Sequence, residues 1–216
     1  IVLTGDFLNT SYNDDPQAVS ELVVLLEQFH APAGIYGVWG TQHVDLPDIL
    51  RPALEGLGIV ILNNQASEIE VAGRRLWLMG VYPTRDLPAD AAHLAELLAA
   101  APPGVPTVLL YHTPDLMPQA AALGVDLYLA GHTHGGQWRL PGFGALVTSS
   151  RYWKRYEAGY YREDNTHLYV SRGLGLEGFG APRARFFCPP EIVTVAFGGP
   201  GAATIEGRPA YPNRGR

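Results

Sequence analysis

The chain has 216 residues and a mass of 23.4 kDa; 47% of its residues are hydrophobic and 17% charged, and its mean hydropathy is +0.01. This composition supplies enough apolar side chains for one sizeable core and excludes a disordered chain. The formal net charge of −6 argues against a nonspecific binder of nucleic-acid backbones, and the single Cys188 excludes an internal disulfide and any zinc module built from several cysteines.

The first half of the chain has the pattern of alternating strands and helices. Residues 1–6 resemble a buried strand that enters a turn, without an initiator Met or a signal sequence, so we expect the natural N-terminus to lie upstream. A helix is expected to begin at Asp15-Pro16. The pattern then predicts a strand at 35–39, a helix at 47–57, and strands at 59–62, 67–71 and 75–81.

The second half continues this alternation and then changes character. Helices are predicted at 89–101 and 115–123, and largely apolar strands at 105–111 and 125–130. Beyond Gly142 the pattern predicts shorter strands at 145–149, 156–161, 167–171 and 192–197. We therefore expect a single α/β domain over residues 1–199 and a loose C-terminal tail over 200–216. No apolar run approaches the roughly 18 residues that would span a bilayer.

Polar side chains of ligand type follow three of the predicted strands. Asp6 follows the first strand, His112 follows the strand at 105–111, and His132 and His134 follow the strand at 125–130. Functional sites of open α/β sheets form at the carboxyl ends of strands, so these side chains are candidates for one site. Imidazoles and a carboxylate, without thiolates, suit zinc, manganese, iron or another first-row ion.

The same residues carry a resemblance to a known family. Residues 4–9 (TGDFLN), 111–115 (YHTPD) and 131–137 (GHTHGGQ) resemble the second, fourth and fifth signature blocks of the calcineurin-like metallophosphoesterases. Residues 169–175 and 189–192 are similar to C-terminal blocks of a bacterial single-domain branch, whose members often carry an N-terminal membrane anchor or an export signal. The resemblance covers nearly the whole chain, with the blocks in the family's order.

The resemblance implies a fold, a metal centre and an activity. The fold would be a four-layer αββα sandwich of two mixed β-sheets, with two divalent ions (Mn, Zn, Fe or Ni) at the strand ends. Asp6 would bridge the ions, His112 and His132 would bind the second ion, and His134 would bind the first. The enzyme would hydrolyse phosphate mono- or diesters with a hydroxide that bridges the two metals.

The sequence departs from the family's pattern in two blocks. The first block, an Asp-x-His on the opening strand, has no counterpart, so the domain is expected to lack its first strand here. The third block, normally Gly-Asn-His-Asp, corresponds to the segment 40–45 (GTQHVD). In one alignment Gln42 supplies the amide oxygen to the metal and His43 acts at the leaving group; in the other, Thr41 and Gln42 take those places and both functions are lost. We favour the first alignment because it keeps an amide followed by a histidine.

Two hypotheses on function follow. The first is a metal-dependent phosphoric ester hydrolase with a small phosphoester as its substrate and no nucleic-acid partner. The alternative is a degenerate relative whose impaired metal site serves a binding or structural role. Membrane contact is expected only through an upstream anchor, and the upstream residues decide whether the protein is cytoplasmic, membrane-anchored or exported.

Overall fold

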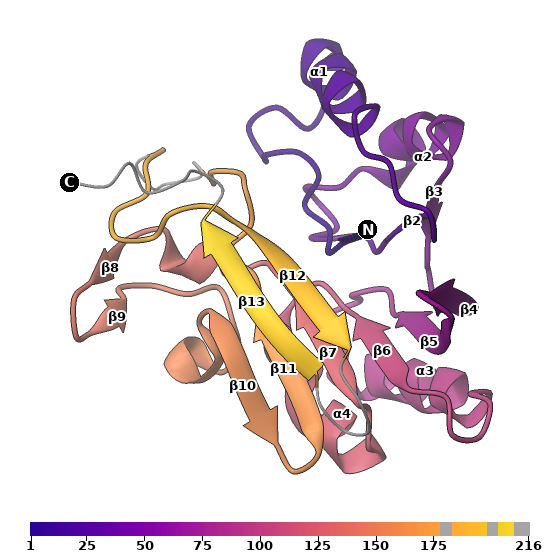
Figure 1. Cartoon of the computed structure of the whole chain (residues 1–216). Helices are drawn as coiled ribbons and strands as arrows, with labels where there is room; N and C mark the ends of the chain where they lie inside the picture. The colour runs from indigo at the N-terminus through magenta and orange to yellow at the C-terminus, as the bar shows by residue number, and fades with distance from the viewer. Residues whose placement is uncertain (178–182, 198–202, 210–216) are drawn as a thin grey trace.

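A computed structural model of the chain describes residues 1–177, 183–197 and 203–209 (Figure 1). Its longer helices are α1 (Pro16–Leu26), α2 (Pro47–Gly56), α3 (Leu87–Ala99) and α4 (Met117–Leu123). The Asp15 carboxylate begins α1 by accepting a hydrogen bond from the Gln17 backbone, and Pro16 occupies the first turn, where its missing N–H costs no hydrogen bond. The helix that the sequence predicts from Asp15-Pro16 therefore forms where the capping residues place it.

The strands form two main sheets. The small sheet is parallel and contains, in order, β1 (Val2–Leu3), β2 (Ile35–Gly37) and β3 (Ile59–Ile61). The large sheet is mixed, and its order is β10 (Gly159–Glu163), β11 (Thr166–Val170), β7 (Leu127–Ala130), β6 (Thr107–Leu110), β5 (Arg74–Gly80) and β4 (Gln65–Val71). Its antiparallel pairs are those of the two edges, β10 with β11 and β4 with β5, and the four central strands are parallel to one another.

Two short hairpins accompany the sheets. One joins β8 (Arg139–Leu140) to β9 (Gly144–Ala145), and the other joins β12 (Glu191–Phe197) to β13 (Ala203–Pro209). Figure 1 shows β12 and β13 crossing the large sheet on the face opposite α3 and α4. Val193, Val195 and Phe197 of β12 pack against the core between the sheets.

Three apolar clusters separate four layers. Leu26 of α1 and Leu50 and Leu54 of α2 pack on the small sheet. Between the sheets, Val38 and Leu62 pack against a set from the large sheet, namely Leu78, Val108, Leu110, Leu127, Leu129 and Tyr169. On the far face of the large sheet, side chains of α3 and α4 pack against another set, which includes Met79, Leu109, Tyr111 and Tyr128. The αββα sandwich that the resemblance implied is thus the observed fold, although the small sheet is parallel rather than mixed over the described strands.

Some predicted elements differ in extent. Of the strand predicted at 145–149, only Ala145 belongs to β9, and the strand predicted at 156–161 begins at Gly159 instead, because residues 153–156 form a 3-10 turn. Part of the expected loose tail, Ala203–Pro209, forms strand β13 because it pairs along its whole length with β12. Residues 200–202 and 210–216 of that tail lie outside the described residues.

Candidate metal centre

Strand ends from both sheets meet at one edge of the sandwich. Asp6 follows β1 of the small sheet, whereas His112 and His132 follow the adjacent parallel strands β6 and β7 of the large sheet. One ligand atom from each of these three residues lies within 4.8 Å of the other two. The structure thus brings together side chains that are up to 126 positions apart in the sequence (132 minus 6).

The spacing of the three side chains suits a shared cation. The distance from His112 Nε2 is 3.1 Å to Asp6 Oδ2 and 3.0 Å to His132 Nδ1, and His132 Nδ1 lies 3.7 Å from Asp6 Oδ2. Donor atoms that share one ion at bond lengths of about 2.0 to 2.2 Å have separations of this order. The donor set, one carboxylate and two imidazoles, therefore fits a divalent first-row metal.

The orientation of His112 is fixed by the backbone. Its Nδ1 donates to the carbonyl oxygen of Thr4 at 2.6 Å, and only 1% of the residue is exposed. In the neutral ring, this hydrogen bond keeps the proton on Nδ1. The lone pair of Nε2 is then free and points at Asp6 and His132. Burial alone would lower the pKa of His112, but the Asp6 charge and the hydrogen bonds that the ring donates to Asp6 and to the Thr4 carbonyl raise it above the usual value.

Asp6 is held as a carboxylate. Burial alone would raise the pKa of its carboxyl, but the His112 charge, together with hydrogen bonds from His112, His132 and the Thr41 backbone, holds that pKa well below its usual range. Thr41 N–H donates to Asp6 Oδ1 at 2.7 Å, so Oδ2 remains directed at the two imidazoles. An ionised carboxylate is the form of Asp6 that can bind a divalent cation.

A second carboxylate fixes the loop that carries Asp6. Asp45 is buried, and its oxygens accept N–H bonds from Asp6 at 2.8 Å, Phe7 at 2.7 Å and Gly40 at 2.7 Å. Burial, and then the Asp6 charge, raise the pKa of Asp45 to about 6 in spite of these donors. Sequence analysis gave Asp45 no role; its signal was a carboxylate at the end of the altered third block, where the family's Gly-Asn-His-Asp also ends in Asp.

Several of these residues have a strained backbone. The φ angles of Asp6, His132 and His134 are +53°, +67° and +50°, which is the left-handed region that side chains other than glycine rarely adopt. Each such residue costs on the order of 1 to 3 kcal/mol, and strain of this kind gathers at functional sites. Three of the four candidate ligands that the sequence pattern singled out therefore carry this strain.

His134 lies close to this group but outside its three mutually adjacent ligand atoms. Its Nδ1 is buried and has no hydrogen-bond partner among the described residues, while its backbone carbonyl accepts bonds from Arg185 and Cys188. Burial, followed by the charge of Arg185, lowers its pKa to about 4, so the ring is neutral near pH 7. A neutral, unpartnered imidazole nitrogen fits the role of a metal ligand.

Thr41, rather than Gln42, contacts the candidate ligands. Thr41 Oγ1 lies 3.4 Å from Asp6 Oδ2, 3.4 Å from His112 Nε2 and 3.5 Å from His132 Nδ1. Gln42 is exposed and its amide nitrogen donates to the Pro83 carbonyl at 3.4 Å, while His43 is exposed and accepts a bond from Asn13 through its backbone carbonyl. This placement corresponds to the alignment that we did not favour, in which Thr41 and Gln42 take the places of the family's Asn and His. The metal-binding role of Gln42 and the catalytic role of His43 stay predictions.

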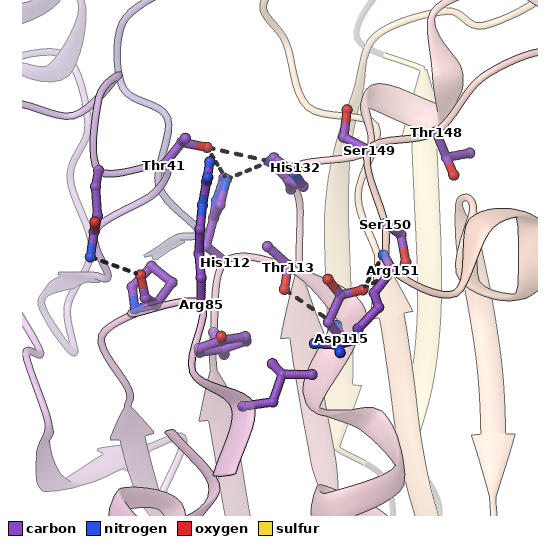
Figure 2. A pocket seen from close by; sticks show the side chains of 14 residues that line it. Thr41, Arg85, His112, Thr113, Asp115, His132, Thr148, Ser149, Ser150 and Arg151 are labelled. Atoms are coloured by element: carbon purple, nitrogen blue, oxygen red, sulfur yellow. Dashed lines mark hydrogen bonds between the residues drawn. The ribbon is translucent and has the colours of Figure 1, made fainter. Parts of the chain in front are cut away.

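A pocket of about 390 Å³ opens beside the candidate ligands (Figure 2). His112, His132 and Thr41 line one end of it, and the remaining wall comes from the loops that follow β5, β6 and β9. The complete lining is Thr41, Gln42, Pro83, Arg85, Leu87, Tyr111, His112, Thr113, Asp115, His132, Thr148, Ser149, Ser150 and Arg151. The pocket is large enough for a small substrate that reaches the metal ligands.

Curated proteins provide relatives over most of the chain. A metallophosphoesterase of Bacillus subtilis is 30% identical over 89% of this chain and 65% of its own length, and a phosphodiesterase of Escherichia coli is 34% identical over 90% of the chain and 68% of its own. A metallophosphoesterase of Aquifex aeolicus is 29% identical over 93% of the chain and 73% of its own length. The chain thus spans about two thirds of the length of the first two relatives. No protein-family profile matches it, and none of the described helices is both long and apolar enough to cross a membrane.

Proposed function

Because the chain belongs to the calcineurin-like metallophosphoesterases, we propose that it hydrolyses phosphate mono- or diesters at the pocket bordered by His112 and His132. The observation that carries the proposal is the convergence of Asp6, His112 and His132 from both sheets within 4.8 Å. These residues, together with His134, are the ones that the resemblance assigns to metal binding. A carboxylate and imidazoles suit divalent ions that polarise a phosphoryl group, and the family membership favours hydrolysis as the reaction of this donor set.

Each candidate ligand contributes a defined property to the centre. Divalent ions held by these residues would supply Lewis-acid polarisation of the phosphoryl group and would lower the pKa of a water that attacks it. Asp6 supplies the negative charge, and its two oxygens face different neighbours, with Oδ2 toward the imidazoles and Oδ1 toward the Thr41 backbone. His112 supplies a lone pair whose direction the Thr4 carbonyl fixes. His134 would bind the first of the two proposed ions, as the resemblance implies, because it lies outside the group of three that surrounds the second.

The substrate that fits this site is a small phosphoester. The pocket volume of about 390 Å³ is in the range of small-molecule sites. A net charge of −6 does not favour a long polyanion such as nucleic acid, so we propose no nucleic-acid partner. Any contact with a membrane is proposed only for a segment upstream of Ile1.

The alternative function also has an observation in its favour. At the position beside Asp6, the chain offers the hydroxyl of Thr41 where the family offers an amide oxygen. A protein with this weakened ligand set could retain one ion in a binding or structural role. The number of bound ions and the hydrolytic activity together separate this alternative from the enzyme.

The test compares the wild-type protein with Asp6→Asn, both at full length. We expect the wild type to hydrolyse p-nitrophenyl phosphate or bis-p-nitrophenyl phosphate with added manganese. Asp6→Asn should remove this activity and lower the affinity for manganese in calorimetry, because it deletes the negative charge between the imidazoles. Asp126→Asn is the matched control, since this carboxylate binds Thr107 at the opposite end of β6. If the wild type hydrolyses neither ester with manganese, zinc, iron or nickel but still binds one ion, the binding or structural role would replace the enzymatic function.

A further inference from the structure

The pocket contains two arginines whose charges have no counterpart. Arg85 and Arg151 line it together with His112 and His132, and neither guanidinium has an ion pair or hydrogen bond among the described residues. Every other arginine whose side chain the structure describes has a partner, for example Arg139 with Glu157 and Arg172 with Glu191. Both side chains are exposed, and together they give this end of the pocket an excess of positive charge in a chain of net charge −6.

The two arginines approach the pocket from different sides. Figure 2 shows Arg85 on the side of Thr41 and His112, and Arg151 on the side of Asp115 and Ser150. Asp115 does not form an ion pair with Arg151; its Oδ1 instead accepts the Ser150 hydroxyl at 2.7 Å and the Arg151 backbone N–H at 3.0 Å. This carboxylate therefore holds the loop in place and leaves the guanidinium available.

The segment that carries Arg85 is likewise held in place. The φ angle of Arg85 is +72°, a left-handed conformation that costs an arginine free energy. The preceding residue, Thr84, donates from its backbone and its hydroxyl to the buried Asp90, which also accepts the hydroxyl of Tyr111 at 2.7 Å. The main chain therefore places Arg85 at the pocket through hydrogen bonds that do not involve its guanidinium.

The pocket wall also holds an unused hydroxyl group. Thr148 lines the pocket on the side of Ser150 and Arg151, and its buried Oγ1 has no hydrogen-bond partner among the described residues. Such a group requires a partner, which a bound ligand or a water molecule provides. Guanidinium groups and hydroxyls are together the usual donors to phosphate and carboxylate oxygens.

We propose that this part of the pocket is a subsite for a second anionic group of the substrate, a phosphate or a carboxylate, whose scissile phosphoryl lies at Asp6, His112 and His132. The subsite rests on the proposed function, and it specifies the substrate class as phosphoesters that carry a further negative charge. Arg85 and Arg151 bind that charge, and the unpartnered Thr148 hydroxyl supplies a further donor.

The test uses two esters that differ by one phosphate. Thymidine 5′-(p-nitrophenyl phosphate) and its 3′-phosphorylated analogue release the same chromophore, so the ratio of their kcat/KM values isolates the added charge. We expect the wild type to favour the 3′-phosphorylated ester by about tenfold to a hundredfold at low salt, in line with charge-assisted hydrogen bonds. The ratio should decrease as the salt concentration rises, because partly exposed charges are screened. Phenyl phosphate and 3-carboxyphenyl phosphate, whose carboxylate cannot reach its own leaving oxygen, show in the same way whether a carboxylate serves equally well.

Variants locate the effect on the two arginines. Arg85→Ala and Arg151→Ala should each bring the ratio toward one, and Arg151→Lys should restore part of it because charge is kept while the bidentate geometry is lost. Arg75→Ala, at the opposite end of β5, is the matched control and should keep the wild-type ratio. A wild-type ratio near one, or a ratio that neither alanine variant changes, would overturn the subsite and leave the phosphoesterase proposal intact.

A binding measurement separates failure of the subsite from failure of the proposed function. Without added metal, calorimetry should detect tighter binding of thymidine 3′,5′-bisphosphate than of thymidine 5′-phosphate, and Arg151→Ala should abolish the difference. If the wild type hydrolyses no ester but shows this difference, the proposed function is wrong while the anion site holds. Equal affinities for the two nucleotides would contradict the subsite whether or not the protein is active.

Discussion

The large and the small sheet hold their candidate ligands by different means. His112 and His132 follow β6 and β7, and all four residues of each of these strands are buried. Asp6 follows β1, a strand of two residues whose Val2 is exposed. Its position depends on two bonds with the loop after β2: its carboxylate accepts from the Thr41 N–H, and its backbone N–H donates to Asp45. Packing therefore fixes the histidine side of the centre, whereas a few polar contacts and glycines fix the carboxylate side. A small substitution near Asp6 should consequently reduce stability and metal binding much more than a similar substitution near His112 and His132.

The largest effect is expected from a single methyl group at Gly40. A Cβ at this position would lie 2.2 Å from the backbone nitrogen of Asp6 and 2.3 Å from its Oδ1, so main chain would have to move. We expect Gly40→Ala to lower the free energy of unfolding by about 3 kcal/mol or more and to abolish metal binding and hydrolysis. Thermal unfolding and calorimetry with manganese measure the two effects.

Gly131 provides the corresponding change on the histidine side. A Cβ there would lie 2.9 Å from the hydroxyl oxygen of Thr4, a side-chain atom that can rotate away. Gly131→Ala should therefore cost about 1 kcal/mol or less and leave manganese binding within about threefold of the wild type. Equal damage from the two glycine variants would show that the two sides are held in the same way.

An intermediate effect is expected from Asp45→Asn. The substitution keeps the shape of the side chain but replaces one of the two oxygens that accept N–H bonds from Asp6, Phe7 and Gly40 with a donor. Loss of a partner that orients a metal ligand typically costs about tenfold to a hundredfold in metal affinity, and we expect a loss of that size here. Asp115→Asn, which loosens a loop on the histidine side, should change manganese affinity less than this.

The smallest effect separates the two alignments of the third block. Thr41→Ala removes the hydroxyl beside Asp6 and both imidazoles, and should weaken manganese binding by about threefold to tenfold. His43→Ala removes an exposed ring outside the pocket lining and leaves turnover nearly unchanged if the alignment through Thr41 and Gln42 is right. A loss of about a hundredfold or more in turnover for His43→Ala would instead support the alignment through Gln42 and His43 and a role as general acid.

The same contrast explains what the sequence could predict. His112 and His132 follow runs of apolar residues long enough to define buried strands, and parallel strands bring their ends to one edge. The family resemblance implied that Asp6 is a metal ligand and that the layers follow the order αββα. Thr41 and Gln42 lie in a loop with no periodicity, and the contact that selects Thr41 is made with Asp6, 35 positions away. The sequence pattern carries no information on which loop residue makes such a contact.

The C-terminal hairpin illustrates another limit. Glycine and proline within residues 200–216 favoured a tail, but Ala203–Pro209 forms β13 because β12 provides the partner for its backbone. The pairing is antiparallel and joins Glu191 to Pro209 at its outer end. The local composition of residues 203–209 disfavours a strand, but pairing with β12 provides enough backbone hydrogen bonds for the strand to form.

The candidate ligands come from two different sheets, so a bound metal ion would also stabilise the folded protein against unfolding. An ion bound by Asp6 joins the small sheet to His112 and His132 of the large sheet, so docking of the sheets and retention of the ion form one equilibrium. By mass action, each tenfold rise in free metal above the dissociation constant adds about 1.4 kcal/mol to the free energy of unfolding. The lifetime of the folded protein would then follow the metal content of its surroundings, independently of the reaction that the site performs.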